Sequence, residues 1–299
     1  MTGSWSLHPE PGAMSRSKGF SLVELAVALA IIALLIAGAL IPLSTQMDVR
    51  NVADTRRSME SIREAIIGFA QANGRLPCPA DGTIPAGGTD ASGRPAGSEQ
   101  LTPATLPPPS TAACTNSFGV VPWTTLGVPE TDGWGRRFSY WVSPIFADGI
   151  GVTPASAAFN NTFPIAQNPA CNAPIPVPTQ SSFALCSQGS FTVNTRNEST
   201  HAATAVGSVL PAVIISHGKN GAGAYIPAGS LLAAPTGADE LANATHTNTA
   251  TTFYSRIPTP AASGCNDAAA GTFCEFDDIV VMIPSNTLIA RMVAAGRLP

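Results

Sequence analysis

A single acidic residue, Glu24, lies inside the apolar run from residue 20 to residue 41, which contains no other ionisable side chain. A carboxylate within a hydrophobic segment costs roughly 2.5–3.5 kcal/mol on membrane-insertion scales, so it usually has a partner. The small residue Gly19 directly precedes the run, where a peptide bond could be cut. Cleavage between Gly19 and Phe20 would create a free amine on Phe20. Glu24, about one helical turn further along, could then pair with that amine in a neighbouring copy of the chain.

A second acidic group lies near the C-terminus, where Glu275, Asp277 and Asp278 fall within four residues. Carboxylates and loop carbonyls are the ligands that Ca²⁺ prefers, but the 12-residue loop pattern of an EF-hand is missing. A calcium site and a solvated acidic turn therefore both stay open. No other cofactor is expected.

The chain contains six cysteines, all after the apolar run. An even number of cysteines in an exported region indicates disulfides rather than free thiols. We predict sequential pairing, although six cysteines allow 15 connectivities. A zinc site is the less favoured alternative, because no C-x-x-C occurs and the four histidines are not clustered near cysteines. The predicted pairs are Cys78–Cys114, Cys171–Cys186 and Cys265–Cys274.

Two further patterns suggest chemistry but are better explained by local structure. The segment from His217 to Gly221 lacks the spacing of a phosphate-binding loop, and its Asn-Gly pair favours a hairpin turn. Ser216 and His217 lack a G-x-S-x-G elbow, and adjacent strand residues point to opposite faces. We therefore expect no catalytic site. A net charge of −4 with only 11% charged residues also gives no basic surface for nucleic acid.

The elements that would position these residues begin with one long helix. Residues 20–41 are long enough to cross a bilayer, and Arg16 and Lys18 before them favour a cytoplasmic N-terminus. Residues 42–74 continue as an amphipathic helix that stops at Asn73-Gly74. The remainder, residues 75–299, forms a head with strands expected near residues 138–142, 212–216, 253–257 and 278–283. Residues 75–118 and 143–200 are expected to be irregular loops, and residues 287–294 have helical character.

The segment from Gly19 to Glu24, Gly-Phe-Ser-Leu-Val-Glu, resembles the type IV prepilin family, which includes pilins and the pseudopilins of type II secretion. The segment from Asp132 to Phe138 is similar to a D-x-W-G-x-x-Y/F segment of pseudopilin heads. The resemblance implies removal of residues 1–19 as a leader by a prepilin peptidase and N-methylation of Phe20. It also implies contact between Glu24 and the Phe20 amine of another subunit. Residues 1–13 look like an over-long start, because Met14 would begin a compact basic leader.

These observations predict an α+β, pilin-like protein with a long N-terminal transmembrane helix on a small antiparallel sheet and long disulfide-braced loops. The expected function is that of a structural, non-enzymatic subunit of a type IV pilus or type II secretion filament. Its large head favours a minor or tip component. The expected partners are the prepilin peptidase, other pilin or pseudopilin subunits and an inner-membrane assembly platform. The subunit would sit in the inner membrane with its head in the periplasm before it enters the filament. The alternative is an ordinary single-pass anchor carrying a periplasmic enzyme or adhesin.

Overall fold

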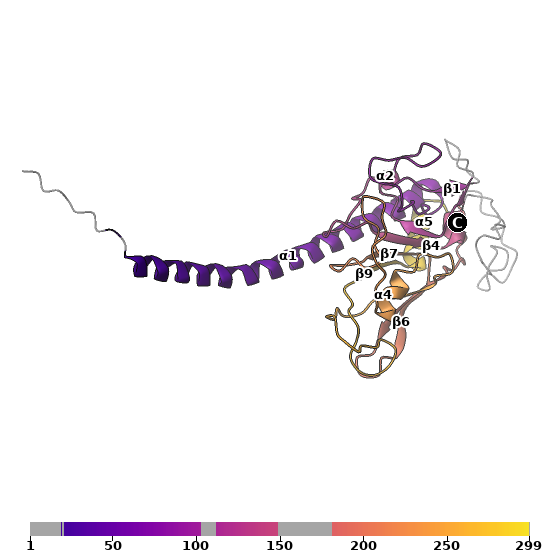
Figure 1. Ribbon diagram of the computed structural model, residues 1–299. Coiled ribbons are helices and arrows are strands. Elements are labelled where there is room, and N and C mark those ends of the chain that lie inside the picture. The colour runs from indigo at the N-terminus through magenta and orange to yellow at the C-terminus, as the bar shows by residue number, and fades with distance from the viewer. Residues whose placement is uncertain (1–18, 20, 103–111, 149–180, 299) are drawn as a thin grey trace, which may run out of the picture. The chain divides into compact units, whose positions relative to one another are not determined.

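The computed structural model describes residues 19, 21–102, 112–148 and 181–298, with no side-chain description for residues 36–45. The chain divides into two units, residues 1–47 and residues 48–299. Helix α1 (Leu22–Asn73) begins in the first unit and continues into the second (Figure 1). It runs through Pro42 without interruption and ends at Asn73, as the sequence predicts. No helix among the described residues has the length and apolar character needed to cross a membrane.

The part of α1 within the second unit packs one apolar stripe into the head. Met59, Ile62 and Ile66 are fully buried, at the helical spacing the sequence shows. Gly74, with φ +73°, ends the helix in the left-handed conformation. Arg297, near the C-terminus, donates hydrogen bonds to carbonyls of the last turn of α1. These bonds satisfy backbone groups that have no partner within the helix.

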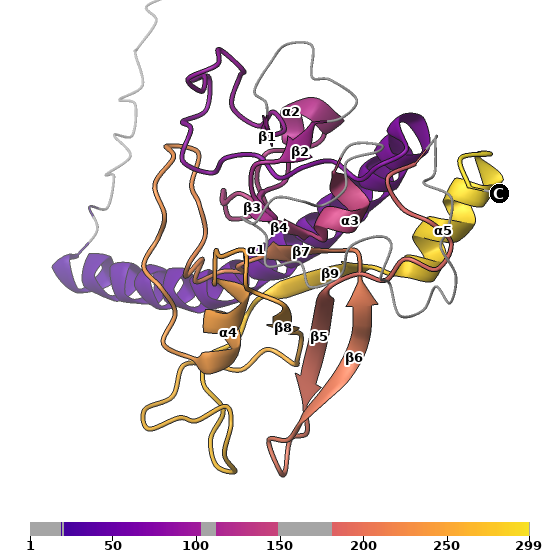
Figure 2. The same ribbon diagram turned by 90° about the vertical axis from the view of Figure 1, so that its right-hand side faces the viewer.

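The central sheet is antiparallel with strand order β3-β4-β7-β9. Its side chains alternate between two cores. Tyr140 and Ile214 face the core formed with α1 and α5 (Ser285–Ala294), whereas Trp141 and Val213 face the second sheet. Figure 2 shows β7 and β9 between α1 and the second sheet. The strands are β3 (Phe118–Val120), β4 (Ser139–Val142), β7 (Ala212–Ser216) and β9 (Ile279–Ile283).

The second sheet, with strand order β6-β5-β8, corrects the expectation of one small antiparallel sheet. It consists of β5 (Phe191–Arg196), β6 (Ala203–Leu210) and β8 (Thr252–Tyr254). Strands β5 and β6 are antiparallel, but β5 and β8 are parallel. The expectation of an irregular segment at 143–200 is wrong for β5. The burial of Phe191 and Val193 under the central sheet stabilises that strand, and a single short sequence window does not reveal this packing.

The segment from Asp132 to Arg136 packs against α1. Asp132 Oδ1 accepts hydrogen bonds from the amides of Trp134 and Arg136, at 2.9 and 3.0 Å, which folds a tight turn. A Cβ atom at Gly133 would lie 2.7 Å from the carbonyl oxygen of Asn51 on α1. Glycine is therefore required there, because the backbone approaches the helix too closely for any side chain.

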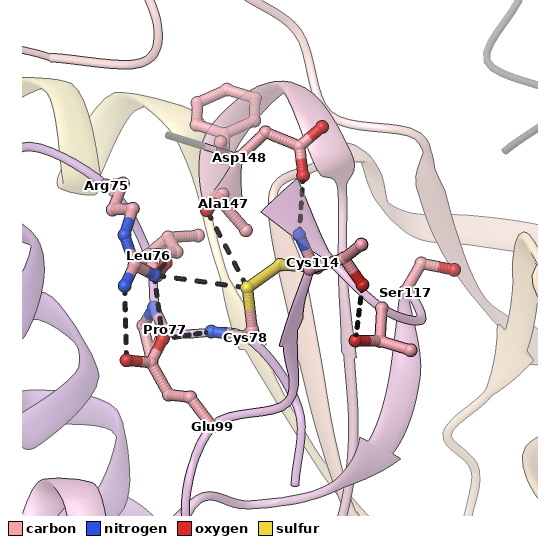
Figure 3. Close-up of a disulfide and its surroundings, with 12 residues drawn as sticks. Arg75, Leu76, Pro77, Cys78, Glu99, Cys114, Ser117, Ala147 and Asp148 are labelled. Carbon is pink, nitrogen blue, oxygen red and sulfur yellow. Dashed lines mark hydrogen bonds and ion pairs between the residues drawn. A yellow bond between two sulfur atoms is a disulfide. The ribbon is translucent and has the colours of Figure 1, made fainter. Parts of the chain in front are cut away.

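The long loop after α1 is held by a disulfide between Cys78 and Cys114, whose Cα atoms are 5.3 Å apart (Figure 3). Beside it, Arg75 and Glu99 form a two-pronged ion pair with N–O distances of 2.7 and 3.1 Å. The amide of Cys78 donates to the same Glu99 carboxylate at 2.6 Å. The segment is irregular, as predicted, but tightly anchored. Short elements lie within and after it: β1 (Leu101–Thr102), β2 (Ala113–Cys114), α2 (Trp123–Leu126) and α3 (Pro144–Ala147).

A second disulfide joins Cys265 to Cys274, with 4.8 Å between the Cα atoms. Both bonds agree with the predicted sequential pairing. The third predicted pair, Cys171–Cys186, includes Cys171, which lies outside the described residues.

The predicted hairpin at residues 217–221 is wrong. Strand β7 has β4 and β9 as its neighbours, so the chain after β7 does not turn back to pair with it. The turn is instead held by long-range contacts. The amide of Asn220 donates to Asp277 Oδ2 at 2.8 Å. Gly218, with φ +55°, lies so close to Asp277 that a Cβ atom would clash.

Candidate functional site

The start of α1 is closed by a reciprocal capping box between Ser21 and Glu24. The amide of Glu24 donates to Ser21 Oγ at 3.1 Å, and the amide of Ser21 donates to Glu24 Oε2 at 3.0 Å. This S-x-x-E spacing is a recognised helix-start signal, so the sequence could have indicated Ser21 as well as Glu24. Gly19, Ser21 and Glu24 are all exposed, and Phe20 lies outside the described residues. The exposed Glu24 carboxylate has more hydrogen-bond acceptor positions than the Ser21 amide uses. It could therefore also accept a hydrogen bond from a cationic group of another molecule.

The first turns of α1 present apolar side chains to the surroundings. Every residue from 21 to 35 is exposed. Leu22 is 87% exposed and Leu34 is 76% exposed. Soluble proteins rarely leave a contiguous apolar surface of this kind uncovered, and such surfaces mark contacts with protein or lipid.

The head contains a separate cluster of three carboxylates. One oxygen each from Glu240, Asp277 and Asp278 lies within 4.8 Å of the others. Glu240 belongs to α4 (Ala238–Asn243), a helix that no local sequence pattern predicts, and the two aspartates directly precede β9. The structure thus brings Asp277 and Asp278 together, but with Glu240 as the third member. The third residue expected from the sequence, Glu275, lies outside the cluster.

Burial dominates the electrostatics of this cluster. It raises the pKa of Glu240 to about 7, although hydrogen bonds from the Asp277 amide and Asn220 oppose the rise. Burial also raises the pKa of Asp277, and raises that of Asp278 well above its ordinary value. Three carboxylates so close together repel one another when ionised, and each one's negative charge disfavours ionisation of the others.

Ser139, His217 and Asp278 form a chain that resembles a serine hydrolase triad. Ser139 Oγ lies 2.8 Å from His217 Nε2, and His217 Nδ1 lies 3.7 Å from Asp278 Oδ1. However, Ser139 and His217 are both fully buried. A substrate carbonyl cannot reach Ser139 Oγ in this arrangement. Burial also lowers the pKa of His217 to about 3, with further lowering by His246 and Arg136. A general base with so low a pKa is poorly matched to neutral pH.

Comparison with known proteins identifies the N-terminal segment. Residues 14–40 match the model of the prokaryotic N-terminal methylation motif. Neither the curated proteins nor the solved structures include a significant match to this chain. The matched residues include Gly19, Phe20 and Glu24, together with the exposed apolar residues at the start of α1. This chain therefore carries the type IV prepilin and pseudopilin signature at its N-terminus.

Proposed function

We propose that this protein is a structural subunit of a type IV pilus or type II secretion filament. The observation that carries the proposal is the methylation motif at residues 14–40, located where an exposed apolar helix begins. In this proposal a prepilin peptidase cuts between Gly19 and Phe20, and Phe20 is then methylated. The apolar helix from residue 20 to residue 41 anchors the subunit in the inner membrane and later packs in the filament.

Glu24 has the central role in assembly under this proposal. Its capping bonds with Ser21 hold the carboxylate at the start of α1. The new amine of Phe20 on a neighbouring subunit would be its cationic partner. Pairing the two charges would offset the cost of burying either one alone in an apolar environment.

The head would then face the periplasm, where the disulfides can form. Its size, which exceeds what a minimal filament subunit needs, favours a minor or tip position. The partners would be the prepilin peptidase, other subunits and the assembly platform of the inner membrane.

The test is filament incorporation of a Glu24→Gln variant in cells that assemble the filament. Gln has the same shape as Glu but carries no charge, so the variant should still lose its leader. The amount of subunit in sheared filaments should fall at least about tenfold, as expected from the loss of a charge-assisted hydrogen bond worth about 1.5–3 kcal/mol.

Glu60→Gln is the matched control, because Glu60 is an exposed acid further along the same helix. It should enter filaments at the normal level. Normal incorporation of the processed Glu24→Gln variant would refute the assigned role of Glu24.

A further inference from the structure

The head has a pocket of about 280 Å³ that none of the three clustered carboxylates lines. Its walls come from the end of β5, from the segment after β8 and from the loop that the Cys265–Cys274 disulfide closes. The volume is just below the range of about 300–1,000 Å³ that is typical of small-molecule sites. The pocket is therefore suited to a single side chain rather than to a cofactor. Its lining includes Arg196, Glu198, Arg256, Ile257, Thr259 and Phe273.

Contacts outside the pocket hold its walls in place. Arg256 donates to Asp239 Oδ2 at 2.9 Å and to Asp267 Oδ1 at 3.0 Å. The amide of Cys274 donates to the same Asp267 oxygen at 3.0 Å, which connects the disulfide loop to this arginine. The guanidinium of Arg256 also lies 4.6 Å from the centre of the Phe273 ring. A pocket that is already formed loses little conformational entropy on binding, and this favours affinity.

His201 packs against the Phe273 wall of the pocket in a strained conformation. Its ring stacks on Phe273, with 3.7 Å between the ring centres and 5° between the planes. Its backbone has φ +56°, a left-handed value that is costly for a residue with a side chain and that clusters at ligand-binding sites. His201 is 1% exposed, and its Nε2 is buried without a hydrogen-bond partner. Native proteins pair most buried polar atoms, so the strain and the unpaired atom together indicate a binding site rather than ordinary packing.

The charged groups at the pocket leave one negative charge without a partner. Arg196 and Arg256 pair with the buried aspartates Asp239 and Asp267, at N–O distances of 2.7, 2.9 and 3.0 Å. These two cations and two anions cancel. Glu198 is exposed and forms no ion pair with any residue that the structure describes. A cationic group beside the pocket would therefore be attracted to Glu198.

We propose that this pocket binds one apolar side chain of a partner polypeptide, and that a neighbouring Lys or Arg of the partner pairs with Glu198. Ile257 and Phe273 provide the apolar contact. Ile257 is 68% exposed, so a side chain that covers it removes apolar surface from water. An apolar or aromatic anchor in a pocket, with an opposite charge at the rim, is typical of protein–protein contacts. The pocket would bind such a segment whether or not the chain enters a filament.

The first experiment uses a positional-scanning library of fluorescein-labelled hexapeptides and the full-length chain in detergent. Binding is read by fluorescence polarisation, with protein-free micelles as the background. Peptides with Phe, Leu or Ile beside Lys or Arg should bind. Replacing the apolar residue by Ser, or the basic residue by Glu, should weaken binding at least about tenfold, as expected for the central residues of a contact. No binding by any peptide at about 1 mM, the weak end of specific affinities, would overturn the proposal.

Two variants then separate the apolar contact from the charged one. Ile257→Asp should weaken the best peptide at least about tenfold. Glu198→Lys should reverse the charge preference, so that peptides with Glu in place of Lys bind better. Both side chains are exposed, so the Tm should stay at the wild-type value. The matched controls Leu231→Asp and Glu60→Lys change exposed residues outside the pocket and should leave the affinity unchanged. Equal affinity of the wild type and both pocket variants would refute the assigned site.

Discussion

At the scale of single residues, Arg137 shows how strongly the head depends on contacts that are distant in sequence. Its guanidinium is fully buried and donates to Glu130 Oε1 at 2.7 and 2.9 Å. It also donates to the carbonyls of Gly82 and Ile84. One cation therefore stabilises loops that have little regular structure, and no local sequence pattern predicts these contacts.

Asp148 provides a pH-dependent prediction at the same scale. Burial raises its pKa to about 6, although a hydrogen bond from the Cys114 amide and the charge of Arg75 oppose the rise. The folded state therefore holds this proton more tightly than the unfolded state. The resulting stabilisation is complete below about pH 4 and is lost as the pH rises through about 6. The free energy of unfolding should fall by about 2.5 kcal/mol between pH 4 and pH 7 because of this group.

Asp148→Asn tests this prediction, because Asn can still accept the bond from Cys114 but does not titrate. The difference in unfolding free energy between wild type and variant, measured by urea denaturation, should change by about 2.5 kcal/mol from pH 4 to pH 7. Asp54→Asn, which alters a carboxylate that is 63% exposed, should give a nearly constant difference. A constant difference for Asp148→Asn as well would show that Asp148 ionises equally in both states.

The residues of the N-terminal motif can be predicted from the sequence, whereas those of the carboxylate cluster can be predicted only in part. Gly19, Phe20 and Glu24 are neighbours in one short motif, so their relation is visible without a fold. The carboxylate cluster combines Asp277 and Asp278 with Glu240, which is 37 residues away from Asp277. Only the packing of α4 against the residues before β9 brings them together, whereas proximity in the sequence indicates Glu275 instead.

At the scale of elements, strongly patterned segments were predictable and weakly patterned ones were not. The end of α1 at Asn73, the strands β7 and β9 and the helix α5 follow the apolar periodicity and the stop residues. Strand β6 was missed because its residues are small, uncharged and mostly exposed. Helix α4 was missed because it lies in a stretch of small residues and depends on contacts of its acidic side chains.

The two described disulfides allow a comparison at this scale. They close loops with sequence separations of 36 and 9 residues. In the chain-entropy model, loops of these lengths correspond to about 4 and about 2.5 kcal/mol of stabilisation. The variant with both Cys78→Ala and Cys114→Ala should therefore lose more unfolding free energy than the variant with both Cys265→Ala and Cys274→Ala.

Chemical denaturation of the two variants without reductant measures this difference directly. Wild type with reductant serves as the reference in which all disulfides are open. A larger loss from the shorter loop would contradict the loop-length argument. It would show that local contacts of Cys265 and Cys274 matter more than chain entropy.

At the scale of the whole molecule, the chain combines a methylation motif, an apolar helix start and a disulfide-braced α+β head. The N-terminal signature was evident in the sequence because it depends on local order. The arrangement of the head, with α1 and α5 on one face of the central sheet and β5 and β8 on the other, was not. Its Gly-rich and Pro-rich segments carry little periodicity, so long-range burial determines their structure.

The most direct test of the filament proposal is mass spectrometry of the mature N-terminus, from cells with and without the prepilin peptidase. The proposal predicts a peptide that begins at N-methylated Phe20 only when the peptidase is present. It also predicts that the leader stays intact in cells without the enzyme. A leader that stays intact in both strains would contradict the proposal, and residues 20–41 would then be an ordinary anchor.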